Sequence, residues 1–478
     1  MSELWAGAAK VDVTGTASGA ANDRLYVRAL ALKNSATAVV IVSLDAVAIG
    51  EIGPVADHYL PGVRSRLQKE LGIAPTHVLV SASHCHGIVC DDVEERTIQA
   101  IREAWRNLEP VHVGVGAGHE DRIQENRRFR LRNGREADAR RAYALPPDDE
   151  VIGVGPIDPQ IGILRLDRAT GQTLAVVYNF ACHPIQGVPS EGNTADLTGF
   201  ASAAIERSLG EGAIALFLQG CAGDVNPALY KGVDAPKNAE VLGSLLGLST
   251  LAAIRQIRTR PGGSIELISE MVELPTADLS PHIEALRAEQ LRLLGSLEGT
   301  NLNLRTFVYL MTKHRLFPDF PSYYSYGYLH EEQIGREHLR SLDAENRREM
   351  EKYLRNVHVM EQLTRVQTNL ALLEKHRGRI AALKKGSISV EVAGLRVGEW
   401  VLITFPGELS VQIGLNIKRA SPHRYTFVSG CTNGYIYYAP TADQLANRGG
   451  AQEDSDCVLA PEWQSLFEGK AAEILSRL

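Results

Sequence analysis

Two apolar strands that each lead into histidines place the strongest constraint on the fold of this chain. The run Val78 to Val80 is followed by His84 and His86. A short apolar run rich in β-branched residues is typical of a buried strand. A second such run, Thr173 to Phe180, is followed by His183 and a proline. Because open α/β sheets place ligands at strand ends, the two runs predict a site at one edge of a sheet.

The spacing of the first two histidines suits metal binding or acid-base chemistry. On an extended backbone, residues two apart share a face, with Cβ atoms roughly 6 to 7 Å apart at about 3.3 Å rise per residue. His84 and His86 would then be two ligands of one ion, or one ligand and one general acid or base. Cys85 would face the other way and is not an expected ligand. A strand that merely ends in two polar residues would show the same pattern.

Strand and helix patterns alternate through most of the sequence, which favours an α/β fold. We expect a central mixed β-sheet domain with flanking helices in residues 1–270 and 386–478. Between 271 and 385, charged residues alternate with leucine and methionine at helical spacing. We interpret this stretch as a long helical insertion, either a lid over the site or a homo-oligomer interface. Its last part, Ser341 to Leu383, would be one long helix or a helical hairpin.

Composition and charge limit the classes of partner. The 478 residues carry a formal net charge of -7, so nothing indicates the basic surface of proteins that bind nucleic acid or anionic membranes. No stretch is apolar and long enough to span a bilayer, and no leader is recognised at the N-terminus. The six cysteines show no paired spacing, which predicts reduced thiols. We expect a cytoplasmic protein that acts on a small molecule.

Polar residues at other strand ends are expected to support the histidines. Asp45 follows the predicted strand Ala38 to Leu44, and Asp196 precedes a helix of small residues. Asp196 would either cap that helix or orient a histidine. Asp224 and Asn226 lie in a glycine-containing loop after a third strand, which would hold an oxyanion or form a plain turn. The aspartates would alternatively bind a second ion, such as Mg²⁺ or Ca²⁺.

Two further charged residues have both a structural and a functional interpretation. Arg127 lies in an arginine-rich segment, which is typical of a solvated face or of a group that binds a carboxylate or an oxyanion. Glu408 follows a predicted strand and a Pro-Gly pair at the start of an expected helix. A helix N-terminus stabilises a charged glutamate, so capping alone would account for Glu408.

Five blocks of the sequence resemble the catalytic domain of the neutral/alkaline, non-lysosomal ceramidase family. The blocks are Ala6 to Thr14, Ser81 to Gly87, Asn179 to His183 with Asp196, Gly220 to Pro227, and Pro406 to Glu408 with Asn433 to Thr441. The resemblance implies four ligands to one Zn²⁺, namely His84, His183, Glu408 and Tyr438. It also implies that His86 contacts the reacting group and that Arg127 takes the place of the family's active-site arginine.

The chain departs from the family pattern around the substrate. Gly87 to Asp92 replaces a Ser-Gly-Pro-Gly-Gly segment, and Asn226 stands where the family has a serine. The region Arg448 to Ala451 lacks the active-site tyrosine expected beyond Pro440, and we expect a protein without the family's C-terminal β-sandwich. We therefore expect a zinc-dependent hydrolase that uses metal-activated water to cleave an amide or ester bond of a small polar metabolite, such as a modified sugar.

Several alternatives stay open from the sequence. One is a metal-dependent lyase or isomerase of a carbohydrate acid, because a fold does not determine a reaction. Another is a ceramidase proper, an N-acylsphingosine amidohydrolase. A third is a thiol hydrolase that uses Cys182 or Cys221. The last is a binding module whose helical insertion recruits partners.

Overall fold

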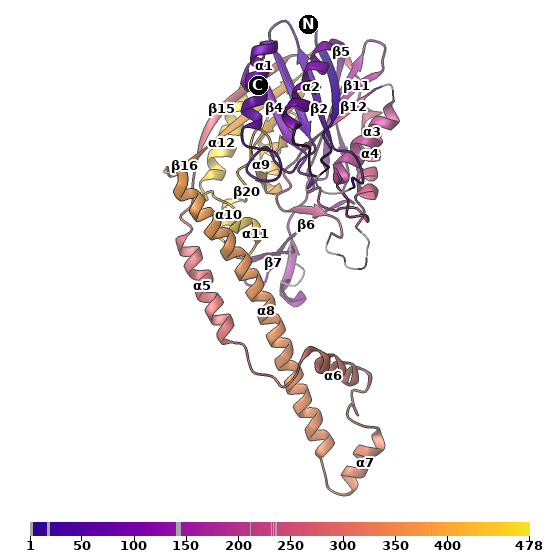
Figure 1. Ribbon diagram of the computed structural model, residues 1–478, viewed down its shortest axis with the longest axis vertical. Coiled ribbons are helices and arrows are strands. Elements are labelled where there is room, and N and C mark those ends of the chain that lie inside the picture. Colours follow the sequence, from indigo (N-terminus) through magenta and orange to yellow (C-terminus); the bar gives the residue numbers. More distant parts are fainter. Residues whose placement is uncertain are drawn as a thin grey trace. The chain divides into compact units, whose positions relative to one another are not determined.

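The computed structural model describes residues 3–16, 20–139, 145–210, 212–230, 232, 234, 237–383 and 385–478. They form a mixed α/β fold (Figure 1), so the expected fold class is confirmed. The chain divides into two compact units, one of residues 1–140, 147–278 and 375–478, and one of residues 141–146 and 279–374.

A nine-stranded mixed sheet forms the centre of the larger unit. Its order is β12-β11-β10-β5-β1-β2-β3-β4, with β14 beside β5. The pairs β3 with β4 and β11 with β12 are parallel, whereas β1, β2, β5 and β10 pair antiparallel with their neighbours. The strands are β1 (Trp5–Asp12), β2 (Tyr26–Lys33), β3 (Ala38–Leu44), β4 (Val78–Ala82), β5 (Glu109–His119), β10 (Gln160–Arg168), β11 (Thr173–Phe180), β12 (Ile214–Gln219) and β14 (Arg260–Pro261).

A second sheet packs against the first. Its order is β15-β16-β17-β19, formed by β15 (Ile265–Pro275), β16 (Ser387–Val397), β17 (Trp400–Thr404) and β19 (Tyr425–Ser429). Apolar side chains of both sheets make one core, in which Leu164 and Leu216 of the first sheet lie with Leu402 and Phe427 of the second. Gly162 lets the sheets approach closely, because a Cβ there would lie 2.3 Å from the Phe427 ring.

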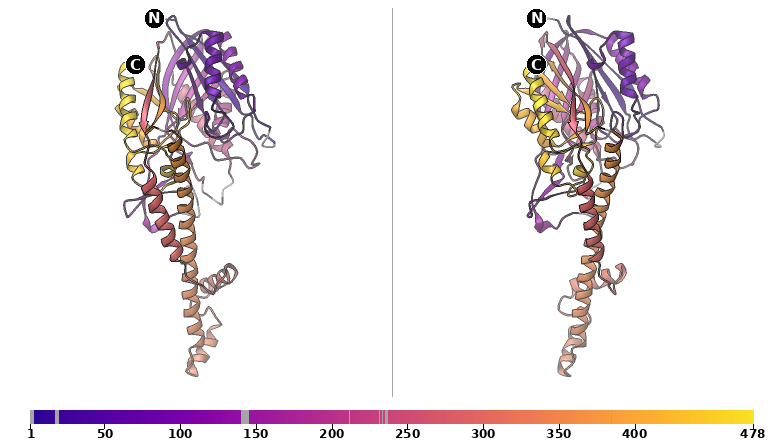
Figure 2. Two further views of the ribbon diagram at one scale, coloured as in Figure 1. Left: turned by 60° about the vertical axis from the view of Figure 1, so that its left-hand side comes forward. Right: turned by 90° about the vertical axis from the view of Figure 1, so that its left-hand side faces the viewer.

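Helices cover the outer face of each sheet. Two apolar clusters pack one face of the first sheet against α1 (Tyr59–Leu71), α2 (Val93–Arg106), α3 (Asp196–Leu209) and α4 (Ala239–Ile254). A third cluster packs the second sheet against α9 (Val411–Ala420) and α12 (Trp463–Arg477). In Figure 2 the purple helices and the yellow helices flank the sheets on opposite sides. Since β4 and β11 are covered on both faces, all of their residues are buried, which explains their continuous apolar patterns.

Short ladders bring the sequence motifs together beyond the ends of the long strands. β6 (Gln124–Asn126) pairs with β13 (Val225–Pro227), and β18 (Glu408–Leu409) pairs in parallel with β20 (Tyr438–Ala439). β7 (Arg128–Leu131) lies between β8 (Glu136–Asp138) and β9 (Val151–Val154). Two short helices, α10 (Ala442–Leu445) and α11 (Gln452–Ser455), follow β20.

The smaller unit is helical. It contains α5 (Ser280–Gly295), α6 (Leu304–Leu316), α7 (Ser325–Gln333) and most of α8 (His338–Leu383). The 46 residues of α8 form one helix rather than a hairpin, and its last residues, 375–383, belong to the larger unit. Among the residues that the structure describes, no helix has both the length and the apolar character needed to cross a membrane. The lid and oligomer roles stay predictions.

Candidate metal centre

Three of the four predicted ligands meet in a buried cluster of the larger unit. His84 lies two residues beyond β4, His183 lies three residues beyond β11, and Glu408 begins β18. These side chains are buried, with 3%, 2% and 5% of each residue exposed. One potential ligand atom from each lies within 4.8 Å of the others. The three residues, which we call the metal cluster, could hold a metal ion.

The distances within the cluster centre on one carboxylate oxygen. Glu408 Oε2 lies 3.2 Å from His84 Nε2 and 2.8 Å from His183 Nε2. The fourth predicted ligand is adjacent, because the Tyr438 hydroxyl lies 3.5 Å from His183 Nε2. The parallel pairing of β18 with β20 makes Glu408 and Tyr438 direct register partners.

Backbone carbonyls determine which ring nitrogens point into the cluster. His84 Nδ1 lies 2.6 Å from the carbonyl oxygen of Val47, and His183 Nδ1 lies 2.5 Å from that of Ala222. A carbonyl can only accept a hydrogen bond, so each Nδ1 carries a proton and donates it. In the neutral ring, Nε2 then presents its lone pair to Glu408. Metal-binding histidines are held in the same way.

The donor atoms of the cluster fit a cation. Glu408 Oε2 has no hydrogen-bond donor among the described residues, although two imidazole nitrogens lie close to it. Three buried lone pairs that face one another require a positive charge between them, either a proton or a metal ion. Two imidazole nitrogens and one carboxylate oxygen match Zn²⁺ and also suit other divalent first-row ions.

The pKa values show where a proton would go without a metal ion. Burial, with help from the charge of Arg127, lowers the pKa of His183 to about 3. Burial alone would lower the pKa of His84, but the charges of Glu408 and Cys431 and the hydrogen bonds to both together outweigh it and raise that pKa well above its usual value. Burial would raise the pKa of Glu408, but the histidines hold it well below its usual range. Only His84 would therefore take up a proton.

Tyr435 contributes a contact that the sequence did not indicate. Its hydroxyl donates a short hydrogen bond to Glu408 Oε1, on the side of the carboxylate away from the histidines. Burial and the charge of Glu408 raise the pKa of Tyr435 well above its usual range, so the phenol keeps its proton. Because the two residues are 27 positions apart, no local sequence pattern indicates the contact.

The backbone around the cluster is strained. His84, Cys431, Asn433 and Tyr437 have φ values of 67°, 48°, 61° and 68°, in the left-handed region that costs a non-glycine residue about 1 to 2 kcal/mol. Such strain gathers at functional sites, where the surrounding structure maintains it.

The left-handed conformation also corrects the expected relation between the first two histidines. β4 ends at Ala82, and His84 is not extended. The expectation that His84 and His86 share a face of one strand is therefore wrong. Their rings nonetheless lie 5.8 Å apart, with His84 buried and His86 exposed. Cys85 is fully buried and does not belong to the metal cluster.

Arg127 is buried beside the cluster. Its guanidinium pairs with Glu453, donates to Asn226 Oδ1 at 2.9 Å and to the carbonyl of Gly223, and lies 5.7 Å from the centre of the Tyr438 ring. The predicted active-site arginine and Asn226 thus contact each other, and Arg127 lies against a predicted ligand. A role in substrate binding stays a prediction.

Two of the three predicted supporting aspartates brace the loops that follow the histidine-bearing strands. Asp45 accepts hydrogen bonds from Arg28 at 2.9 Å and from the amide of Tyr26 at 2.8 Å. The next two residues, Ala46 and Val47, present carbonyls that accept from the amide and from Nδ1 of His84, respectively. Asp196 accepts from the amides of Gly187 and Leu197, both at 2.7 Å, and so secures the loop after His183.

The third aspartate braces the segment after Glu408. Asp224 Oδ1 accepts from the amide of Val411 at 2.8 Å, and Oδ2 accepts from Asn126 at 3.2 Å. These contacts fix the start of α9. Whether any of the three aspartates binds a second ion stays a prediction.

The two cysteines of the thiol alternative are poorly suited to nucleophilic attack. Burial raises the pKa of Cys182 well above its usual value, and it raises the pKa of Cys221 as well. Because the thiolate is the reactive form, both side chains are expected to be inert.

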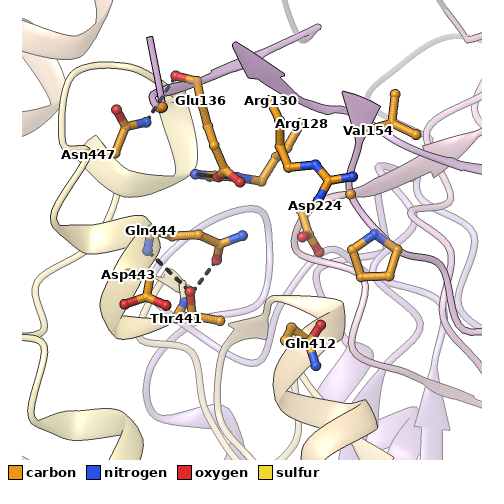
Figure 3. Close-up of a pocket in the computed structure, with 13 residues that line it drawn as sticks. Arg128, Arg130, Glu136, Val154, Asp224, Gln412, Thr441, Asp443, Gln444 and Asn447 are labelled. Carbon is orange, nitrogen blue, oxygen red and sulfur yellow. Dashed lines mark hydrogen bonds and ion pairs between the residues drawn. The ribbon is translucent and has the colours of Figure 1, made fainter. Parts of the chain in front are cut away.

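A cavity of about 300 Å³, lined mainly by polar and charged residues, lies elsewhere in the larger unit, and no residue of the metal cluster lines it. Figure 3 shows side chains from β7, α9 and α10 around it. Arg128, on its wall, forms a two-pronged ion pair with Asp454, at 2.8 and 3.0 Å. The cavity shares Asp224 with the surroundings of the metal centre but contains none of the predicted ligands.

Comparison with known proteins identifies the fold. No protein-family model matches the chain, and no curated protein matches it. A neutral ceramidase from Pseudomonas aeruginosa is similar over 100% of this chain and 75% of its own, with a TM-score of 0.62 and 17% identity. A structure described as ceramidase complexed with C2 is similar over 100% of this chain and 76% of its own, with a TM-score of 0.62 and 16% identity. The expected resemblance to neutral ceramidase is confirmed at the level of the fold.

Proposed function

We propose that this chain, built on a fold that solved ceramidases share, is a zinc-dependent hydrolase that cleaves an amide or ester bond of a small polar metabolite. The observation that carries the proposal is the metal cluster. Two oriented Nε2 lone pairs and a carboxylate oxygen that has no hydrogen-bond donor in the described part of the chain converge in a buried space. Two of these groups lie just beyond strand ends, where α/β sheets place ligands.

In this proposal His84, His183 and Glu408 hold the ion, and Tyr438 is the fourth ligand. A bound Zn²⁺ supplies Lewis acidity, which lowers the pKa of water and polarises a carbonyl group. The carbonyls of Val47 and Ala222 keep both imidazoles oriented for the ion. Tyr435 keeps the carboxylate of Glu408 oriented through its hydrogen bond.

His86 is the proposed proton donor to the leaving group. Its ring lies 5.8 Å from that of His84 and is exposed, so a substrate can reach it. Imidazole exchanges protons near neutral pH, which suits general acid catalysis. The positive charge of Arg127 lies 5.7 Å from the centre of the Tyr438 ring and would favour negative charge in the site.

Close packing of the chain at Gly87, next to His86, supports a small substrate. A Cβ on Gly87 would lie 2.5 Å from the Leu25 side chain and 2.6 Å from the carbonyl oxygen of Thr194. Just beyond it, the amide of Ile88 donates to Asn193 at 2.8 Å, which secures the segment that replaces the family's glycine-rich one. The ceramidases named above act on ceramide, an amide, and we transfer only the bond class to this chain.

Metal analysis of the purified chain tests the proposal first. We expect about one zinc per chain, lost in His183→Ala and Glu408→Ala together with activity, because each substitution removes one of the few ligands. His58→Ala is the matched control, since the His58 side chain is 82% exposed. Full activity of a metal-free preparation would overturn the proposal.

Product analysis in ¹⁸O-labelled water then distinguishes hydrolysis from elimination or isomerisation. Hydrolysis must place label in the released acid, whereas isomerisation need not take up oxygen from water. A product without label would move the assignment to the lyase or isomerase alternative.

A further inference from the structure

The last residues of α8 contact Tyr437, which precedes the predicted ligand Tyr438 on β20 and lies beside the strand of Glu408. We call residues 375–383 the helix foot; they belong to the same compact unit as the metal cluster. The buried Tyr437 ring lies 4.6 Å from the His376 ring, 4.2 Å from Lys375 Nζ and 5.1 Å from the Arg379 guanidinium carbon. The Tyr437 carbonyl in turn accepts a hydrogen bond from the Glu408 amide at 3.0 Å.

His376 makes a second contact toward the same segment. It is fully buried, and its Nε2 lies 2.6 Å from Asp456 Oδ1. The carbonyl of Asp456 accepts from the amide of Tyr438 at 3.2 Å. His376 therefore supports Tyr437 directly through its ring and Tyr438 indirectly through Asp456.

Arg379 connects the helix foot to the loop after β3, which orients His84. Its guanidinium pairs with both carboxylate oxygens of Glu51, each at 2.5 Å. Glu51 lies in the loop that follows β3, and Val47 of that loop accepts the proton of His84 Nδ1. A two-pronged arginine–carboxylate pair restricts geometry more than a single contact does.

We infer that the helix foot is a positioning element for the metal centre, with His376 and Arg379 as its positioning residues. The foot joins the loop that orients His84 to the paired strands β18 and β20, which present Glu408 and Tyr438. These two segments come from different parts of the chain, and their ligands must be held in one geometry for tight binding. The inference rests on the proposed metal binding and deepens it, because it assigns the helical insertion a contribution to the site through its last residues.

Zinc affinity of the full-length chain, measured by competition with a chromophoric chelator, tests the inference. We expect Arg379→Gln and His376→Leu each to weaken zinc binding about tenfold, the lower end of the effect seen for residues that orient ligands. His376→Gln keeps an N–H donor toward Asp456 and should recover part of the loss. Arg377→Gln is the matched control, because Arg377 lies on the same helix and is exposed.

A double-mutant cycle and a spectrum separate positioning from general loss of stability. Glu51→Gln should weaken binding as much as Arg379→Gln does, and the double variant should be no weaker than either single one. The visible absorption bands of the Co²⁺-substituted protein should shift in His376→Leu and stay unchanged in Arg377→Gln. If His376→Leu does not fold, Arg379→Gln and Glu51→Gln, which alter side chains at the surface, carry the test.

The outcomes distinguish this inference from the proposed function. A wild-type chain that binds no metal would remove the proposed function itself. A second outcome is that the wild-type chain binds zinc and that Arg379→Gln and Glu51→Gln match the control Arg377→Gln in zinc affinity and Co²⁺ spectrum. This outcome would overturn the positioning role and leave the proposed function intact.

Discussion

The hydrogen bond from Tyr435 to Glu408 gives a sharp test of the metal centre. Tyr435→Phe removes only the hydroxyl, and it leaves Glu408 Oε1 without that donor in a buried site. A hydrogen bond to a charged group contributes about 1.5 to 3 kcal/mol. Since about 1.4 kcal/mol corresponds to a factor of ten, we expect zinc to bind roughly 10- to 100-fold more weakly.

The assay for Tyr435→Phe is zinc titration against a competing chelator, together with urea unfolding of the metal-free chain. Tyr59→Phe is the matched control, because Tyr59 is also buried and its hydroxyl lies 2.8 Å from Thr97 Oγ1, in the core between α1 and α2. Both variants should lose stability, but only Tyr435→Phe should lose zinc affinity. Wild-type zinc affinity in Tyr435→Phe would refute the reasoning that this hydrogen bond orients the carboxylate.

Three further predictions concern stability, and a fourth concerns the thiols. Burial would raise the pKa of Glu120, but its hydrogen bonds from Arg122 and Ser249 lower it to about 2 from 4.5. This stabilisation is therefore complete above about pH 4.5 and is lost as the pH falls toward about 2. Glu120→Gln should lower the free energy of unfolding by about 1 to 2 kcal/mol at pH 7, a range reduced because the partner arginine is exposed to solvent. In the wild type, the urea midpoint should fall between pH 5 and pH 2, and this fall should be smaller in Glu120→Gln. An equal fall in both proteins would contradict the role of Glu120. Gly162→Ala should destabilise the chain by about 1 to 3 kcal/mol, because its Cβ would overlap the Phe427 ring between the sheets. Gly378→Ala should instead stabilise it by about 0.5 to 1 kcal/mol, because it lies within α8 and a Cβ meets nothing within 4 Å. Wild-type urea midpoints in both variants would contradict both predictions. Cys182→Ala should keep zinc content and activity, and loss of activity with zinc retained would revive the thiol alternative.

The sequence predicted the parts of the site that are local. An apolar run followed by a histidine marks a strand end, so His84 and His183 could be identified without the structure. The helical spacing of apolar residues in α8 could also be recognised from the sequence, because amphipathic spacing is a local property. A helix of 46 residues could nevertheless not be distinguished from a hairpin, because spacing does not show where a chain reverses.

Pairing between distant segments could not be predicted from the residues alone. Glu408 and Tyr438 lie in strands of two residues each, too short to show a period. Only the family resemblance linked them to the histidines, and it assigned no role to Tyr435. The strands of the second sheet were recognisable, but their packing against the first sheet depends on contacts such as that of Gly162 with Phe427, which no local pattern shows.

The left-handed residues around the metal cluster affect how this chain could respond to selection. At Cys431 and Asn433, glycine would adopt the observed φ without the steric penalty. Glycine at 431 would also remove the Cys431 thiol, which lies 3.7 Å from His84 Nδ1. Glycine at 433 would remove the side-chain oxygen of Asn433, which accepts from the Val80 backbone amide at 2.9 Å. Laboratory evolution for heat resistance alone would therefore be expected to enrich glycine at these positions, whereas selection for turnover would remove it. Sequencing both kinds of evolved population would show which residues the metal centre requires and which the fold merely tolerates.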